Sequence, residues 1–334
     1  MSLNDKLTTA EISHLWNSYV FDSLIHNLFS YFLSNVEDED IKKYIEYVIS
    51  ATKQHITDYA NIFMEECIPV PRGILPEDVN TNTSRLFSDK FYIVYGENLV
   101  KFAFNNFAFA YVESNREDIR KLFKERIDEL KEVHQNVINI LASKDINVKP
   151  PYIDTRSKIE FVENNDFFAG YLGEIRNLSS LEIKHLFYNQ LSNSIGKALM
   201  AGFSRVASSR EIKDYFTKGG EMADKYVKLF SDKLLKEEIS QSISLDSEVL
   251  TYSGEKSPLS DRFMLNHTVF LNSFGIGNYG ISLAQSQRRD LTAMYGKLIV
   301  EVGLYANKGV DLLINNKWLE QPPLPARKKE LAHR

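Results

Sequence analysis

The chain contains the same module twice, and this duplication limits its possible folds more than any other feature. The stretch LTTAEISHLW, which starts at residue 7, returns as LSSLEIKHLF at residue 178, which is 171 positions later. After one inserted residue the correspondence continues, so that Arg116 matches Arg288 and Glu129 matches Glu301. We therefore expect two copies of one fold, each with its own hydrophobic core.

Helical periodicity and the scarcity of chain-breaking residues predict an all-α protein. The chain has only 15 Gly and 9 Pro, mostly grouped between long periodic segments. Capping boxes at Thr8-x-x-Glu11 and Ser179-x-x-Glu182 mark the start of the first helix in each copy. The pattern predicts four helices per copy, at about residues 9–34, 38–66, 89–114 and 117–144, and at about residues 180–207, 209–237, 261–286 and 288–317.

Loop lengths predict how these helices are connected. Short polar loops join the first helix to the second and the third to the fourth, which is typical of antiparallel hairpins. About 20 residues rich in Pro and Asn separate the second helix from the third, and they are long enough to cross the whole bundle. We therefore predict two tandem ferritin-like four-helix bundles, each with one long crossover between helices 2 and 3.

The predicted domains follow from this pattern. They are a first bundle at residues 1–150, a linker with a short helix at 151–177, a second bundle at 178–326 and a basic tail at 327–334. The linker carries several aromatic side chains that are costly to leave in water, so we expect it to pack across the bundles.

Composition excludes several classes of function. A hydrophobic content of 43% with 25% charged residues is typical of a soluble globular protein, and the formal net charge of −5 provides no basic field for nucleic acid. A single cysteine, Cys67, excludes a disulfide framework and a thiolate zinc cluster. Neither a signal peptide nor a membrane span is recognisable, so we expect a cytoplasmic protein.

One candidate site lies inside the first bundle. At about 100° per residue, five side chains with metal-binding groups are expected to point inward at similar heights. These are Asp22, His26, His55, Glu129 and His134. Imidazole and carboxylate groups suit one transition-metal ion such as iron or zinc, with Tyr19 or Tyr95 as a hydrogen-bond donor to the ligands. The chain has no Glu-x-x-His, however, so the usual di-iron pattern is missing.

The second copy lacks most of these residues. The equivalents of Asp22, His26, His55 and His134 are Asn193, Lys197, Tyr226 and Ala306. A metal site would therefore belong to the first bundle, and we expect Lys197 to pair with Glu301 in the second. The inward histidines have a second interpretation, because a buried histidine is often a hydrogen-bonded core residue with Tyr and Asn partners.

Several motifs, taken in order, are similar to a known family. They are LTTAEISHLW, IPVPRGILPEDVN, RLFSDKFYIVYG, REDIRKLF and VKPPYI, and looser versions recur in the second copy. In this order they resemble the family named domain of unknown function 3231, found in spore-forming bacilli, over nearly the full chain as two tandem domains. The resemblance implies a ferritin-like fold and a relation to spore-coat proteins, and it implies no established activity.

Two interpretations of function remain open. The first is a ferritin-like protein of unknown activity that binds one iron or zinc ion in the first bundle. The second is a non-enzymatic scaffold or protein-binding module related to sporulation or the spore coat. Neither interpretation assigns catalytic residues. The duplication indicates a module that once formed a homodimer, so the chain is expected to be an internal pseudo-dimer, itself a monomer or a homodimer.

Overall fold

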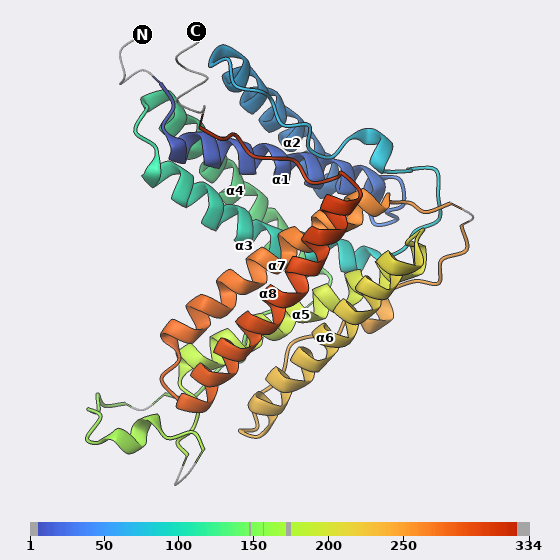
Figure 1. Ribbon diagram of the computed structural model, residues 1–334. Coiled ribbons are helices and arrows are strands. Elements are labelled where there is room, and N and C mark those ends of the chain that lie inside the picture. The colour runs from blue at the N-terminus through green and yellow to red at the C-terminus, as the bar shows by residue number, and fades with distance from the viewer. Residues whose placement is uncertain (1–5, 147, 156, 172–174, 255, 326–334) are drawn as a thin grey trace. The chain divides into compact units, whose positions relative to one another are not determined.

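A computed structural model of the chain describes residues 6–146, 148–155, 157–171, 175–254 and 256–325 (Figure 1). These residues form eight α-helices and no β-strand. The helices are α1 (Thr9–Leu33), α2 (Glu39–Glu65), α3 (Asp89–Glu113), α4 (Glu117–Ser143), α5 (Ser180–Val206), α6 (Arg210–Leu235), α7 (Asp261–Gln285) and α8 (Arg289–Asn315). The all-α prediction is confirmed, and every predicted helix is present with ends that differ by no more than two residues.

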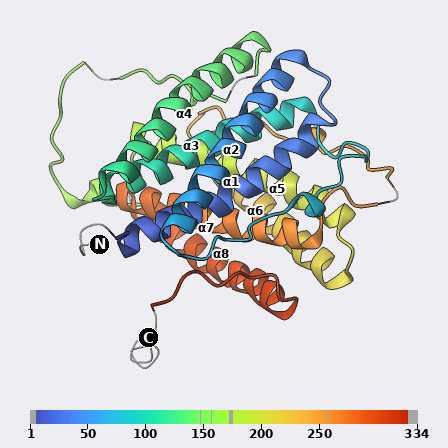
Figure 2. The ribbon, with the colours of Figure 1, turned by 90° about the horizontal axis from the view of Figure 1, so that it is seen from above.

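The helices belong to two compact units. Unit 1 contains α1, α2, α3 from Gly96 onward and α4 as far as Ile140. Unit 2 contains α5 to α8, together with the first residues of α3 as far as Tyr95. In unit 1, α1 and α2 form a hairpin (Figure 2), and the fold as a whole is consistent with two four-helix bundles.

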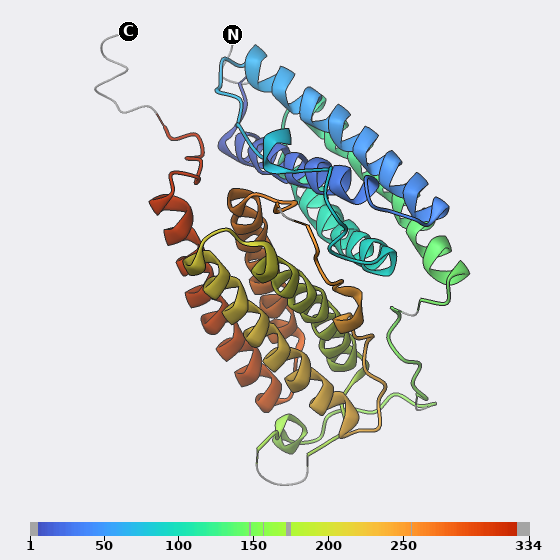
Figure 3. The ribbon, with the colours of Figure 1, turned by 90° about the vertical axis from the view of Figure 1, so that its right-hand side faces the viewer.

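Polar contacts show the relative directions of α6, α7 and α8 in unit 2. The carboxylate of Asp261, at the start of α7, accepts a hydrogen bond from the backbone N–H of Ser208, which precedes α6, at 3.0 Å. Lys233, in the last turn of α6, pairs with Asp290 in the first turn of α8. The connection between α6 and α7 therefore runs back along the bundle, as the sequence predicts, and the four helices lie side by side (Figure 3).

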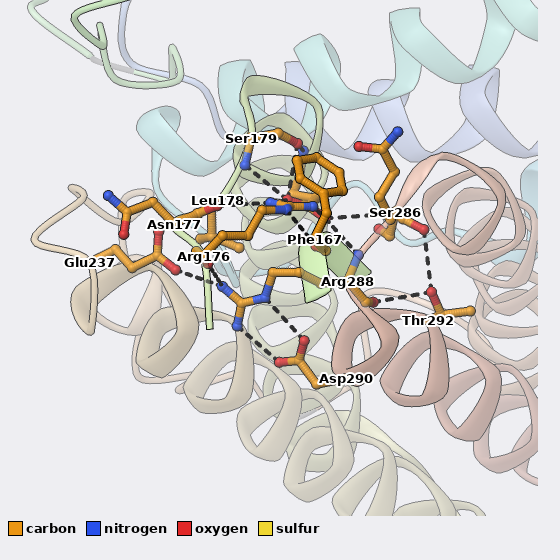
Figure 4. Close-up of polar contacts among 12 residues, drawn as sticks. Phe167, Arg176, Asn177, Leu178, Ser179, Glu237, Ser286, Arg288, Asp290 and Thr292 are labelled. Carbon is orange, nitrogen blue, oxygen red and sulfur yellow. Dashed lines mark hydrogen bonds and ion pairs between the residues drawn. The ribbon is translucent and has the colours of Figure 1, made fainter. Parts of the chain in front are cut away.

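A buried glutamate, Glu182, connects three chain segments in unit 2, and Figure 4 labels its partners Arg176, Ser179 and Arg288. Glu182, the capping-box residue of α5, accepts a hydrogen bond from the N–H of Ser179 at 2.9 Å. It also accepts from the N–H groups of Gln287 at 3.1 Å and Arg288 at 2.9 Å, directly before α8. Burial would raise the pKa of this carboxyl group, but hydrogen bonds from Arg176 and from the backbone lower it to about 2. The residue that begins one helix therefore also fixes the start of another.

Unit 1 repeats this arrangement at Glu11, which is fully buried. Its carboxylate accepts hydrogen bonds from the N–H groups of Asn115 and Arg116, each at 2.8 Å. Arg116 in turn pairs with Glu66 at the end of α2. Each capping glutamate thus fixes the relation between the first, second and fourth helices of its copy, which explains why the chain repeats this motif.

The linker agrees with its prediction in one respect and differs in another. The expected short helix is present as a 3-10 helix, Asn165–Phe168, and the guanidinium of Arg176 lies 4.2 Å from the ring centre of Phe167. Tyr152 and Phe161 are 96% and 88% exposed, so the expected packing of the linker aromatics is wrong for these two residues. They lie in a segment without helical or strand structure, which presents no regular face to a neighbour.

Candidate polar site in unit 1

His55 of α2 lies between two carboxylates from other helices. Its Nδ1 is 3.0 Å from Oδ2 of Asp22 on α1, and its Nε2 is 2.7 Å from Oε2 of Glu129 on α4. His55 is 6% exposed and Asp22 is 3% exposed. A carboxylate accepts hydrogen bonds and does not donate them, so both ring nitrogens act as donors when the carboxylates are ionised. The imidazole then carries a positive charge.

The surroundings of His55 favour this protonated form. Burial alone would lower the pKa of His55, but the charge of Asp22 and the hydrogen bonds to Asp22 and Glu129 outweigh burial and raise it. Burial would raise the pKa of Glu129, yet the hydrogen bond and charge of His55 lower it. With the imidazole protonated and both carboxylates ionised, this triad carries a net charge of −1.

The stability of unit 1 is therefore expected to fall as the pH rises. A raised histidine pKa contributes stability that is complete below the unfolded-state pKa of about 6.5 and is lost as the pH rises through the folded-state value. The check is urea denaturation between pH 6 and pH 9, followed by tryptophan fluorescence, because Trp16 and Trp318 both belong to unit 1. A free energy of unfolding that does not decrease above pH 6.5 would contradict a protonated His55.

The other two histidines of the predicted set have contact partners outside this triad. Nδ1 of His26 is 3.2 Å from both the carbonyl oxygen of Ile49 and Oγ1 of Thr52, so α2 satisfies it. The ring of His134 packs edge-on against Phe104, with the ring centres 6.4 Å apart. The structure thus brings together Asp22, His55 and Glu129, and the five-residue metal site stays a prediction.

The predicted donor Tyr95 lies in unit 2. There its hydroxyl is 2.5 Å from Nε2 of the fully buried His267. Burial lowers the pKa of His267 to about 3, so this imidazole is neutral at physiological pH. Tyr95 therefore contributes to the core of unit 2.

An arginine beside the triad, Arg126, has no role in the predicted site. The guanidinium of Arg126, on α4, hydrogen-bonds to Asp58 and lies 3.9 Å from Glu129. Only 9% of its side chain is exposed. An arginine on an otherwise inward helical stripe is the sequence signal that could have indicated this second buried ion pair.

A cavity of about 70 Å³ adjoins the triad. Asp22, His55 and Glu129 contribute to its wall. The rest of the wall is mainly apolar and includes Phe21, Tyr44, Leu99, Phe107 and Val133. The triad presents little polar surface to this space, which is almost entirely apolar, as the walls of small-molecule binding sites predominantly are.

The second copy replaces the charged triad with hydrogen bonds from neutral donors. Tyr226, the equivalent of His55, donates a hydrogen bond to Glu301 at 2.7 Å. Asn193, the equivalent of Asp22, donates to the hydroxyl of Tyr279 at 2.7 Å. The two copies therefore keep one fold but differ in the charge of this position.

The expected pairing of Lys197 with Glu301 is wrong. Lys197 forms ion pairs with Asp224 and Asp246, each at 2.8 Å. Glu301 instead pairs with Lys225 at 2.8 Å. The Lys197 side chain is 26% exposed, so its ammonium group remains near the surface and avoids the cost of full burial.

In the residues that the structure describes, these features define an all-α fold with two units of paired helices and an imidazole–carboxylate site centred on the buried His55. The chain belongs to the family described as "Protein of unknown function (DUF3231)", whose model matches residues 1–159 and again residues 166–331. The double match confirms both the predicted family and the tandem duplication. No curated protein matches the chain.

One solved structure is similar to part of the chain. It is described as a "putative spore coat protein" from Bacillus halodurans, and it is 16% identical with a TM-score of 0.41. The match covers 45% of this chain and 98% of that chain. In the part of the chain that the structure describes, every helix is too short or too polar to span a membrane.

Proposed function

We propose that unit 1 is a ferritin-like bundle that binds a short aliphatic amine in the cavity beside Asp22, His55 and Glu129. The observation that carries this proposal is a triad with net negative charge in the wall of a cavity whose exposed surface is almost entirely apolar. An ammonium group would neutralise the excess carboxylate charge, and an alkyl group would contact the apolar wall.

The size of the cavity limits the ligand. One water molecule occupies about 30 Å³ in the liquid, so a cavity of about 70 Å³ has room for only a few heavy atoms. Amines with roughly two to four carbon atoms are the class that combines this size with one positive charge. The antiparallel hairpins and the long connection between the second and third helices support the ferritin-like description.

The residues present are poorly suited to a transition-metal ion, the group that a ferritin-like fold suggests. Both ring nitrogens of His55 already face carboxylates, and the Arg126 guanidinium lies 3.9 Å from Glu129. Within the described ranges, no three side chains among His, Cys, Asp and Glu are arranged to hold a metal. A metal ion that bound Nε2 of His55 would have to displace its proton, whereas an ammonium group would bind carboxylate oxygens and leave that proton in place.

Calorimetric titration with propylammonium, 1-propanol and propionate tests the proposal. These three ligands are similar in size and differ in charge, so we expect saturable binding of propylammonium, weaker binding of propanol and none of propionate. The variant Glu129→Gln should weaken propylammonium binding by about tenfold or more, because it removes one negative charge and keeps a hydrogen-bond acceptor. The matched variant Glu301→Gln, at the equivalent position of unit 2, should have no effect.

Two results would overturn the proposal. The first is the absence of propylammonium binding, and the second is equal weakening by Glu129→Gln and Glu301→Gln. Elemental analysis of the purified protein should run in parallel. Stoichiometric iron or zinc that is lost in a His55→Ala variant would favour the metal interpretation instead.

A further inference from the structure

Helix α8 has two apolar faces, and only one of them is covered. Its inner face buries residues such as Leu291, Tyr295 and Leu298 in the core of unit 2. On the opposite face, Val300 and Leu304 are each 62% exposed. A surface helix of a globular protein normally has one apolar stripe and one polar face. The second, outward apolar stripe of α8, which contains Val300 and Leu304, therefore requires an explanation.

The first copy provides an internal comparison for this face. The equivalents of Val300 and Leu304 on α4 are Asp128 and Glu132. On α4, Asp128 forms ion pairs with Lys124 at 2.7 Å and with Lys131 at 2.6 Å, in the manner of an ordinary solvent-exposed face. The same position of the same fold is therefore charged in one copy and apolar in the other.

The difference extends along the helix. Five charged residues of α4 have small or apolar equivalents on α8. In order, Ala293, Gly296, Val300, Gly303 and Leu304 replace Lys121, Lys124, Asp128, Lys131 and Glu132. Exposed residues recur every seven positions along α8, at Ala293, Val300, Asn307 and Ile314. A second set lies three positions after the first three of these residues and consists of Gly296, Gly303 and Val310. This is the spacing of the contact seam in a coiled coil, and small residues allow a second helix to approach closely.

We propose that α8 packs against α8 of a second copy of this chain, antiparallel, about a two-fold axis near Leu304. The charges on the stripe select this partner and this direction. Lys297 and Asp311 are each seven residues from Leu304, on opposite sides. In an antiparallel pair, Lys297 faces Asp311 of the partner subunit, and the symmetry produces this ion pair twice. A parallel pair would bring like charges together.

The groups on the stripe are available for this contact. The Lys297 side chain is 70% exposed, and its contact with Glu301 in the same helix is long, at 3.7 Å. A groove of about 430 Å³ between α6 and α8 has Leu304 on its wall, which leaves room for a partner side chain beside the stripe. The surface is thus both apolar and complementary in charge to itself.

Sedimentation equilibrium of the full chain tests the proposal. We expect the wild-type protein to be a dimer at micromolar concentration. The double variant Val300→Asp/Leu304→Glu should be monomeric, with an unchanged far-ultraviolet circular dichroism spectrum, because it carries the residues that α4 already has at these positions. The matched variant Asp128→Val/Glu132→Leu in unit 1 should leave the wild-type dimer intact.

Charge exchange tests the antiparallel arrangement without altering the apolar contact. Lys297→Glu and Asp311→Lys should each weaken dimerisation by about tenfold, and the combination Lys297→Glu/Asp311→Lys should restore it. A monomeric wild-type protein would overturn the proposal. A Val300→Asp/Leu304→Glu variant that remains dimeric would do so as well, as would a failure of the combined charge variant to recover.

Discussion

Replacement of His55 by tyrosine is expected to lower the free energy of unfolding of unit 1 by about 3 to 5 kcal/mol, the usual cost of removing one partner from a buried ion pair. The change leaves Asp22, which is 3% exposed, without the imidazolium that faces it at 3.0 Å. It also leaves the buried Asp22 and the partly exposed Glu129 as two carboxylates without a positive charge between them. Urea denaturation at pH 7, followed by the fluorescence of Trp16 and Trp318, measures this effect in the unit concerned.

The second copy supplies the control for this experiment. The double variant Asp22→Asn/His55→Tyr reproduces the residues that accompany Glu301 in unit 2, where Tyr226 donates to the carboxylate. It removes the unpaired charge together with the histidine, so it should be more stable than His55→Tyr alone by about 2 kcal/mol. If the double variant is no more stable than the single one, the loss of charge pairing does not explain the effect.

The variant Glu182→Gln is expected to lower the free energy of unfolding of unit 2 by about 3 kcal/mol at pH 7. The pKa of Glu182 is about 2, against an ordinary value of 4.5, and each pKa unit corresponds to about 1.4 kcal/mol. A lowered carboxyl pKa contributes stability that is complete above pH 4.5 and is lost as the pH falls toward 2. The difference between wild type and variant, measured by far-ultraviolet circular dichroism in urea, should therefore be smaller at pH 3 than at pH 7.

The equivalent variant Glu11→Gln serves as the comparison. Glu11 keeps the backbone hydrogen bonds of this arrangement, and hydrogen bonds from Thr8, Asn115 and Arg116 lower its pKa against the effect of burial. Arg176 adds an ion pair to Glu182, with 2.8 Å between Nη1 and Oε2. We therefore expect the smaller loss for Glu11→Gln. Equal losses would show that the Arg176 ion pair adds nothing to the backbone hydrogen bonds.

The helices were predictable because their signals are local. A capping box such as Thr8-x-x-Glu11 lies within one turn, and the structure forms it as the sequence indicates. The second role of Glu11 was not predictable in this way, because its partners Asn115 and Arg116 are 104 and 105 residues away. The assignment of the first residues of α3 to unit 2 likewise depends on tertiary packing, which no local pattern contains.

The candidate site was predictable in part, for a related reason. Helical angles predicted five inward side chains as metal ligands, and the structure brings Asp22, His55 and Glu129 into contact from three helices. The angle of a residue on a helix does not determine which neighbour its side chain contacts. His26 therefore binds the carbonyl oxygen of Ile49, and His134 packs on Phe104. The cavity wall and the Arg126–Asp58 pair also depend on packing between helices.

The duplicated glutamate contacts have a consequence for the order of events during synthesis. Glu11 emerges early, but the N–H groups of Asn115 and Arg116 that satisfy its carboxylate follow 104 and 105 residues later. A nascent or truncated chain that ends before these residues cannot bury Glu11 without leaving part of a carboxylate unsatisfied, which is strongly unfavourable. The same holds for Glu182 and Arg288 in the second copy. Each glutamate thus links complete burial of its first helix to the arrival of its fourth, so that incomplete chains remain open to proteases and chaperones.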